Sequence, residues 1–142
     1  MNSKEYFQNV YTAVRKLQVL RERRNVYLSM GLSSPGMSSD GIHGGSIKSS
    51  RTEKAALELA ELSEGIESHI TELSAILLDA ERILEQLDPS YARILQMRYI
   101  QCLRWSEIQH ALGCDAATTY RRHGRALQAA GRILESIEKR ID

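Results

Sequence analysis

The 142-residue chain has little proline, few aromatic side chains and no long apolar segment. Only 2 prolines interrupt it, and 1 Trp, 1 Phe and 6 Tyr make β-favouring aromatics scarce. No apolar run approaches the roughly 18 residues that a bilayer requires, so we expect no membrane span. The first residues have no apolar segment behind a basic start, and 2 cysteines give no disulfide framework. The sequence therefore predicts a cytoplasmic protein.

The charges are distributed unevenly, although the net charge is only +1. Residues 1–50 and residues 89–142 each carry a net charge of +4, whereas residues 51–88 carry −7. A basic end segment beside an acidic middle favours a nucleic-acid contact confined to one module. Charge alone leaves open the alternative that these are solvated helix faces whose charges happen to segregate.

Three segments organise the first part of the chain. Residues 4–29 carry apolar side chains at steps of three and four, which is typical of an amphipathic helix. In residues 31–50, 13 of 20 residues are Gly, Ser or Pro, and such a segment buries too little to offset its ordering entropy. We therefore expect a flexible loop there. Residues 52–87 show heptads with three apolar positions, one of them occupied by His69, which we interpret as a core residue. Residues 1–87 are predicted to form a long helical hairpin.

A second domain is predicted over residues 88–142. Asp88-Pro89 is a helix-start signal, with a capping carboxylate before a proline at the first helical position. A helix is expected from there to about Cys102.

The next three elements have the order of a helix-turn-helix unit. A helix of about two turns is expected over residues 105–112, and Gly113 supplies a left-handed C-cap. Asp115 then caps a basic helix that starts at Ala116 and continues apolar three–four spacing to the chain end. In such units the short helix braces the second one so that its first turns enter the major groove.

Residues 88–134 resemble region 4 of bacterial sigma factors, and the whole chain resembles a family of small phage and prophage late-gene transcription regulators. The likeness is carried by Trp-Ser-Glu-Ile at residues 105–108 and by Tyr-Arg-Arg-His-Gly-Arg-Ala-Leu at residues 120–127. It implies an all-α fold in which a helical hairpin precedes a sigma-like helix-turn-helix with an extended last helix. It also implies a regulator that binds double-stranded DNA sequence-specifically in the cytoplasm of a bacterial host cell.

The same resemblance implies which side chains contact DNA. Arg121 is the leading reader, because arginine can pair bidentately with guanine. Arg122 stands where sigma-like helices usually carry an apolar residue, so it marks a departure from the pattern. The candidates for base reading are Ala116, Ala117, Thr118, Tyr120 and Arg121, and those for phosphate contacts are Arg98, Arg104 and Arg125.

Other classes of function find less support in the residues. The Cys and His spacings match no common zinc pattern, no Gly-rich phosphate loop precedes a helix, and neither cysteine has a nucleophile's signature. We therefore expect no metal, no cofactor and no enzymatic activity. Unfilled apolar faces on residues 56–87 and 127–141 favour a homodimer, and host RNA polymerase is a further expected partner. Two alternatives stay open: a phage DNA-packaging component like the small terminase, and a polymerase-binding module without DNA contact.

Overall fold

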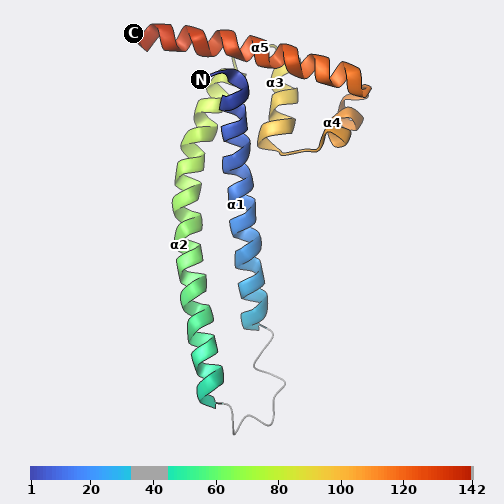
Figure 1. The fold of residues 1–142 in the computed structure, drawn as a ribbon. Coiled ribbons are helices and arrows are strands. Elements are labelled where there is room, and N and C mark those ends of the chain that lie inside the picture. Colours follow the sequence, from blue (N-terminus) through green and yellow to red (C-terminus); the bar gives the residue numbers. More distant parts are fainter. Residues whose placement is uncertain (33–44, 142) are drawn as a thin grey trace. The chain divides into compact units, whose positions relative to one another are not determined.

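The structure, a computed structural model, describes residues 1–32 and 45–141 (Figure 1). As expected from the sequence, the chain is all-α, and the described part contains no strand. None of its helices is long and apolar enough to cross a membrane. The elements are α1 (Ser3–Leu32), α2 (Gly45–Leu84), α3 (Pro89–Leu95), the π-helical turn η1 (Gln96–Ile100), α4 (Trp105–Leu112) and α5 (Ala116–Ile141).

The chain divides into two compact units, and the division does not follow the boundary at residue 88 that the sequence suggests. One unit combines Met1–Arg15 with Leu73–Asp142, and the other comprises Lys16–Glu72. The physical reason is that the start of α1 and the end of α2 supply core residues to the C-terminal helices. Phe7 and Ile83, which are 0% and 1% exposed, belong to the same apolar cluster as Ile94 and Ile108.

The larger unit, which holds the candidate site, is built around this cluster. Tyr6 Oη donates a hydrogen bond to Asp79 Oδ2 at 2.5 Å, which joins α1 to α2 within the unit. Burial and the Asp79 carboxylate both raise the pKa of Tyr6, so its hydroxyl stays protonated. The buried members of the cluster are Phe7, Ile83, Leu84, Leu87, Ile94, Leu95, Met97, Tyr99, Ile108, Ala126 and Ala130.

The smaller unit is an antiparallel pair of helix segments from α1 and α2. A groove between them is lined by residues such as Leu20 and Tyr27 on α1 and by Glu58 and Gly65 on α2. A hydrogen bond to Glu58 raises the pKa of Tyr27. His69 is 6% exposed, so the prediction that it is a core residue is confirmed.

Two sequence expectations about element bounds are wrong in part. Residues 31–32 and 45–50 of the expected loop are helical, because α1 continues to Leu32 and α2 starts at Gly45. Extending an existing helix costs far less than nucleating one, so weak helix formers join its ends. The rest of that loop, residues 33–44, lies outside the described residues.

The single helix expected from residue 89 to about residue 102 is also interrupted. After α3 the helix changes to the π-helical turn η1, where Gln101 N–H donates to Gln96 O, five residues earlier, at 2.8 Å. It ends before Cys102, whose backbone is left-handed with a φ of 57°.

Candidate nucleic-acid interface

Helices α4 and α5 are joined by a turn of three residues, 113–115, whose hydrogen bonds join residues close to one another in sequence. Gly113 adopts φ 63°, and the Cys114 N–H donates to Gln109 O at 3.1 Å, which closes the end of α4. Asp115 Oδ1 accepts a hydrogen bond from Thr118 N–H at 2.8 Å and so caps the start of α5. Hydrogen bonds from the side chain and then from the backbone of Thr118 lower the pKa of Asp115, so the cap stays ionised near neutral pH. The glycine and the cap predicted from the sequence are thus both present.

The fully buried residues of α5 are small, which lets the helix approach the other helices closely. Thr119, Ala126 and Ala130 are fully buried. The Thr119 hydroxyl donates to Asp115 O at 2.8 Å, so burying it leaves no unpaired polar group. On α4, Ile108 is also fully buried within the same core cluster. The first turns of α5 are therefore held rigidly with one face inward, and this fixes which side chains point outward.

Most of the predicted base readers are exposed. Ala116, Ala117 and Arg121 are exposed, and Tyr120 is 50% exposed. Thr118 is half-buried. Arg122, which the sequence left ambiguous, is exposed as well, so no arginine stem has to run through the core. Four of the five predicted base readers are therefore accessible to a partner.

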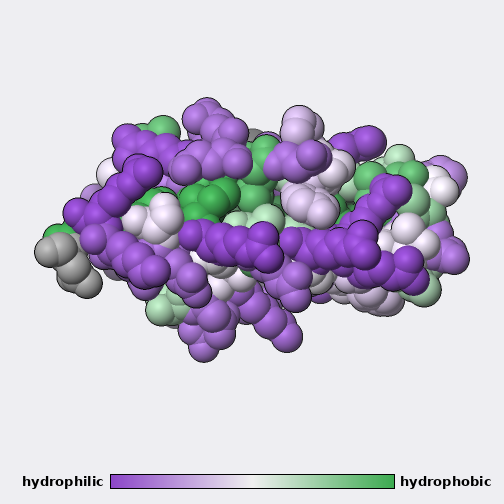
Figure 2. All heavy atoms as spheres, turned by 90° about the horizontal axis from the view of Figure 1, so that it is seen from above, coloured by the Kyte–Doolittle hydropathy of each residue, from purple (hydrophilic) through white to green (hydrophobic). Residues whose placement is uncertain are grey.

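A line of three exposed arginines follows the outer face of α5. Arg121, Arg125 and Arg132 fall within roughly 40° of one another around the axis, at about 100° per residue, and nearly opposite Ala130. We call these three residues the arginine row. Within the described residues none of them forms an ion pair. Figure 2, which views the molecule from the side of α5, shows a mainly hydrophilic surface with a smaller hydrophobic area between the polar groups.

The two remaining phosphate candidates are placed differently from each other. Arg104 is 85% exposed at the N-terminus of α4, where its Nε donates to Glu107 Oε1 at 3.2 Å. Its guanidinium is thus at the surface, with an acidic neighbour that a phosphate would have to displace.

Arg98 does not have the free side chain that a phosphate contact requires. Its guanidinium carbon lies 4.8 Å from the ring centroid of Trp105 and 5.6 Å from that of Tyr11. Its Nη1 donates to Leu103 O at 3.0 Å. The residue is half-buried because a cation held over two rings exchanges water for π-faces. The structure therefore presents Arg98 as a brace between η1 and α4.

A cluster of aromatic rings that the sequence did not reveal supports the recognition end of α5. Tyr99 Oη and His123 Nε2 are hydrogen-bonded at 2.7 Å, and the two rings stack with their centroids 5.7 Å apart. The ring centroid of Trp105 lies 4.7 Å from that of His123, in an edge-to-face arrangement, and 4.9 Å from that of Tyr120. In the sequence only the motif around Trp105 indicated this aromatic cluster, because no local pattern links Tyr99 to His123, 24 residues later.

The same cluster is electrostatically set to keep His123 neutral. Burial, followed by the nearby cations Arg98 and Lys4, lowers the pKa of His123 to about 4. Burial likewise raises the pKa of Tyr99. A neutral imidazole can accept the Tyr99 hydroxyl proton, so the hydrogen bond is stable near neutral pH.

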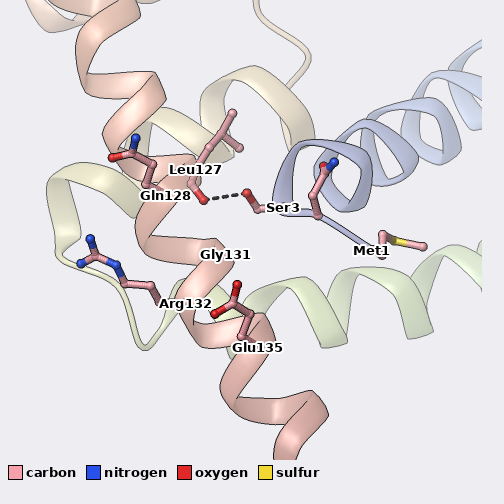
Figure 3. Close-up of a pocket in the computed structure, with 8 residues that line it drawn as sticks. Met1, Ser3, Leu127, Gln128, Gly131, Arg132 and Glu135 are labelled. Atoms are coloured by element: carbon pink, nitrogen blue, oxygen red, sulfur yellow. Dashed lines mark hydrogen bonds between the residues drawn. The ribbon is translucent and has the colours of Figure 1, made fainter.

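The start of the chain packs against the middle of α5. Ser3 Oγ donates to Leu127 O at 2.6 Å, beside a shallow hollow of about 450 Å³ (Figure 3). In Figure 3 the side chains of Gln128 and Arg132 point to the opposite side of α5 from Ser3. Arg132 lines this hollow together with the N-terminal residues and is nevertheless exposed.

No group of three metal-ligating side chains occurs among the residues that the structure describes. In the same part of the chain, Cys102 and Cys114 are half-buried and free.

Comparison with known proteins places the chain in a family. The sequence model described as "Protein of unknown function (DUF1492)" matches residues 31–131, which is most of the chain. No curated protein and no solved structure matches it.

Proposed function

We propose that this chain, which belongs to the DUF1492 family, binds double-stranded DNA through the outer face of α4 and α5. In this proposal the unit is a sigma region 4-like helix-turn-helix, and the protein is a phage-type transcription regulator.

One observation carries the proposal. The first turns of α5 present exposed small and polar side chains, while the arginine row lies opposite a fully buried face. A B-DNA major groove is about 12 Å wide and admits one helix whose outward residues meet base edges. Unpaired guanidiniums beside those residues match the phosphates that line the groove. The charge of Arg121 acts on Asp115, but none of the three arginines forms an ion pair among the described residues, so their guanidiniums can bind phosphates.

The side chains then divide by role. Arg121 reads guanine through its two-pronged guanidinium, which is worth about 1–3 kcal/mol of discrimination against the wrong base. The exposed methyl of Ala117 and the partly exposed one of Thr118 fit thymine methyl groups. Arg125 and Arg104 hold phosphates, so they contribute affinity without sequence preference.

A homodimer follows from the same proposal, because helix-turn-helix proteins commonly contact two half-sites about one helical turn apart. Two copies would double both the base contacts and the number of phosphates neutralised.

The experiment has two steps. Duplexes bound by the full chain are first selected from a random pool. Affinity for the selected duplex and for an unrelated one is then measured by fluorescence anisotropy over a range of salt concentrations. We expect log Kd to rise linearly with log salt, with a slope that reflects several released counterions.

The variants separate base recognition from phosphate contacts. Arg121→Ala should reduce the ratio of the two affinities, whereas Arg125→Ala should weaken both duplexes alike and lower the slope by about 0.9 for each bound protomer, which is about 1.8 for a dimer. Arg21→Ala, an exposed arginine on α1, is the charge-matched control and should change neither quantity. Salt-insensitive or absent binding would overturn the proposal and favour a polymerase-binding module. A ring of many subunits in solution would favour a packaging component.

A further inference from the structure

Arg132 extends the arginine row well beyond the turns of α5 that a helix-turn-helix unit needs. It lies 11 residues after Arg121, which corresponds to about 16 Å along the helix at 1.5 Å per residue. Arg125 stands between them on the same face, and Gln128 occupies the intervening position of that line. The row therefore crosses more than the roughly 12 Å width of a major groove.

The Arg132 side chain is available for a partner. It is exposed, and it has no ion pair in the described part of the chain. Glu135 lies one turn later on the same side, yet the two charges are not within ion-pair distance. Arg132 lines the hollow beside Met1, Asn2 and Ser3, and Figure 3 shows its side chain on the opposite side of α5 from Ser3.

We infer that the DNA-binding surface extends along α5 to Arg132, whose guanidinium binds a phosphate on the strand that flanks the groove. This inference rests on the proposed function. For a helix that lies across the groove, Arg121 and Arg132 are farther apart than the groove is wide, so the two cannot both meet base edges. When Arg121 reads bases, Arg132 reaches the sugar-phosphate wall. A recognition helix whose C-terminal end contacts the backbone is a known docking geometry.

The inference assigns a chemical role to Gln128 as well. Its uncharged amide lies between Arg125 and Arg132 and can donate to a phosphate or sugar oxygen without releasing a counterion. An arginine at position 128 would add a positive charge between Arg125 and Arg132 on the same face of α5.

The test compares three variants by anisotropy over a range of salt concentrations, using the same two duplexes. Arg132→Ala should lower the log–log salt slope by about 0.9 for each bound protomer and weaken both duplexes roughly three- to ten-fold. Gln128→Arg should raise the slope by a similar amount. Arg140→Ala is the matched control: it removes the same charge from the same helix, but at a position about 80° away from the row. It should leave the slope unchanged.

The outcomes separate this inference from the proposed function. If the wild-type chain binds duplex DNA and Arg125→Ala lowers the slope, but Arg132→Ala behaves like Arg140→Ala, the surface ends before Arg132 and the inference is wrong. If the wild-type chain binds no duplex, the proposed function fails and the inference with it. Urea unfolding of Arg132→Ala checks its fold. Arg132→Lys keeps the charge and should retain the wild-type slope, which a purely structural role would not require.

Discussion

Replacing Arg98 tests whether this residue is a brace or a phosphate ligand. Its guanidinium lies over Trp105 at 4.8 Å and donates to Leu103 O at 3.0 Å, so Arg98→Ala removes both interactions. A partly buried cation–π contact contributes about 1 kcal/mol, and a hydrogen bond from a charged donor about 1.5–3 kcal/mol. We expect the free energy of unfolding to fall by about 2–4 kcal/mol. Arg98→Lys should recover only part of it, because an ammonium lacks the planar fork.

The assay is urea unfolding followed by circular dichroism, with duplex binding measured on the same samples at a urea concentration where each variant is folded. Arg93→Ala, an exposed arginine on α3, is the control and should change the free energy of unfolding by no more than about 0.5 kcal/mol. The pKa of His123, measured by NMR, should rise in Arg98→Ala, since Arg98 is one of the cations that lower it.

The opposite pattern would refute this reasoning. If Arg98→Ala keeps wild-type stability and the wild-type pKa of His123, but lowers the salt slope of DNA binding by about 0.9 for each bound protomer, Arg98 contacts phosphate, as the sequence first suggested.

Three further predictions concern stability and assembly. The pKa of His123 is about 4 in the folded chain and near 6.5 when unfolded, so unfolding takes up a proton between these values. The free energy of unfolding should therefore fall as pH drops from about 6.5 to 4, by roughly 1–2 kcal/mol for a ring that is only partly buried, and His123→Phe should abolish this component. Asp115→Ala should cost about 0.5–2 kcal/mol in urea unfolding by removing the α5 cap, and an equally stable variant would contradict the cap's role. Light scattering should give twice the 16.1 kDa of one chain, and a monomer at all concentrations would exclude the dimer.

The local chemistry of the site could be predicted from the sequence, because it depends on neighbouring residues. Gly113 and Asp115 mark the two sides of the turn through backbone geometry and capping, and both act within four residues. The exposed position of Arg121 followed from the same helical rotation.

What escaped prediction depends on contacts between distant residues. Arg98 differs from Arg125 only through the rings around it, and no local pattern shows that Tyr11 and Trp105 meet it. The pairing of Tyr99 with His123 is hidden for the same reason. The division of the chain likewise depends on Phe7, which enters a core made mostly of residues beyond position 80.

Amide chemical shifts of the labelled full chain, recorded while a selected duplex is added, test the central claim most directly. The account predicts that the largest changes occur from Ala116 to Arg125 and at Arg132, while the amides of residues 16–30 and 51–72 shift little. Shifts confined to residues 16–30 and 51–72, or no shifts at all at low salt, would contradict it.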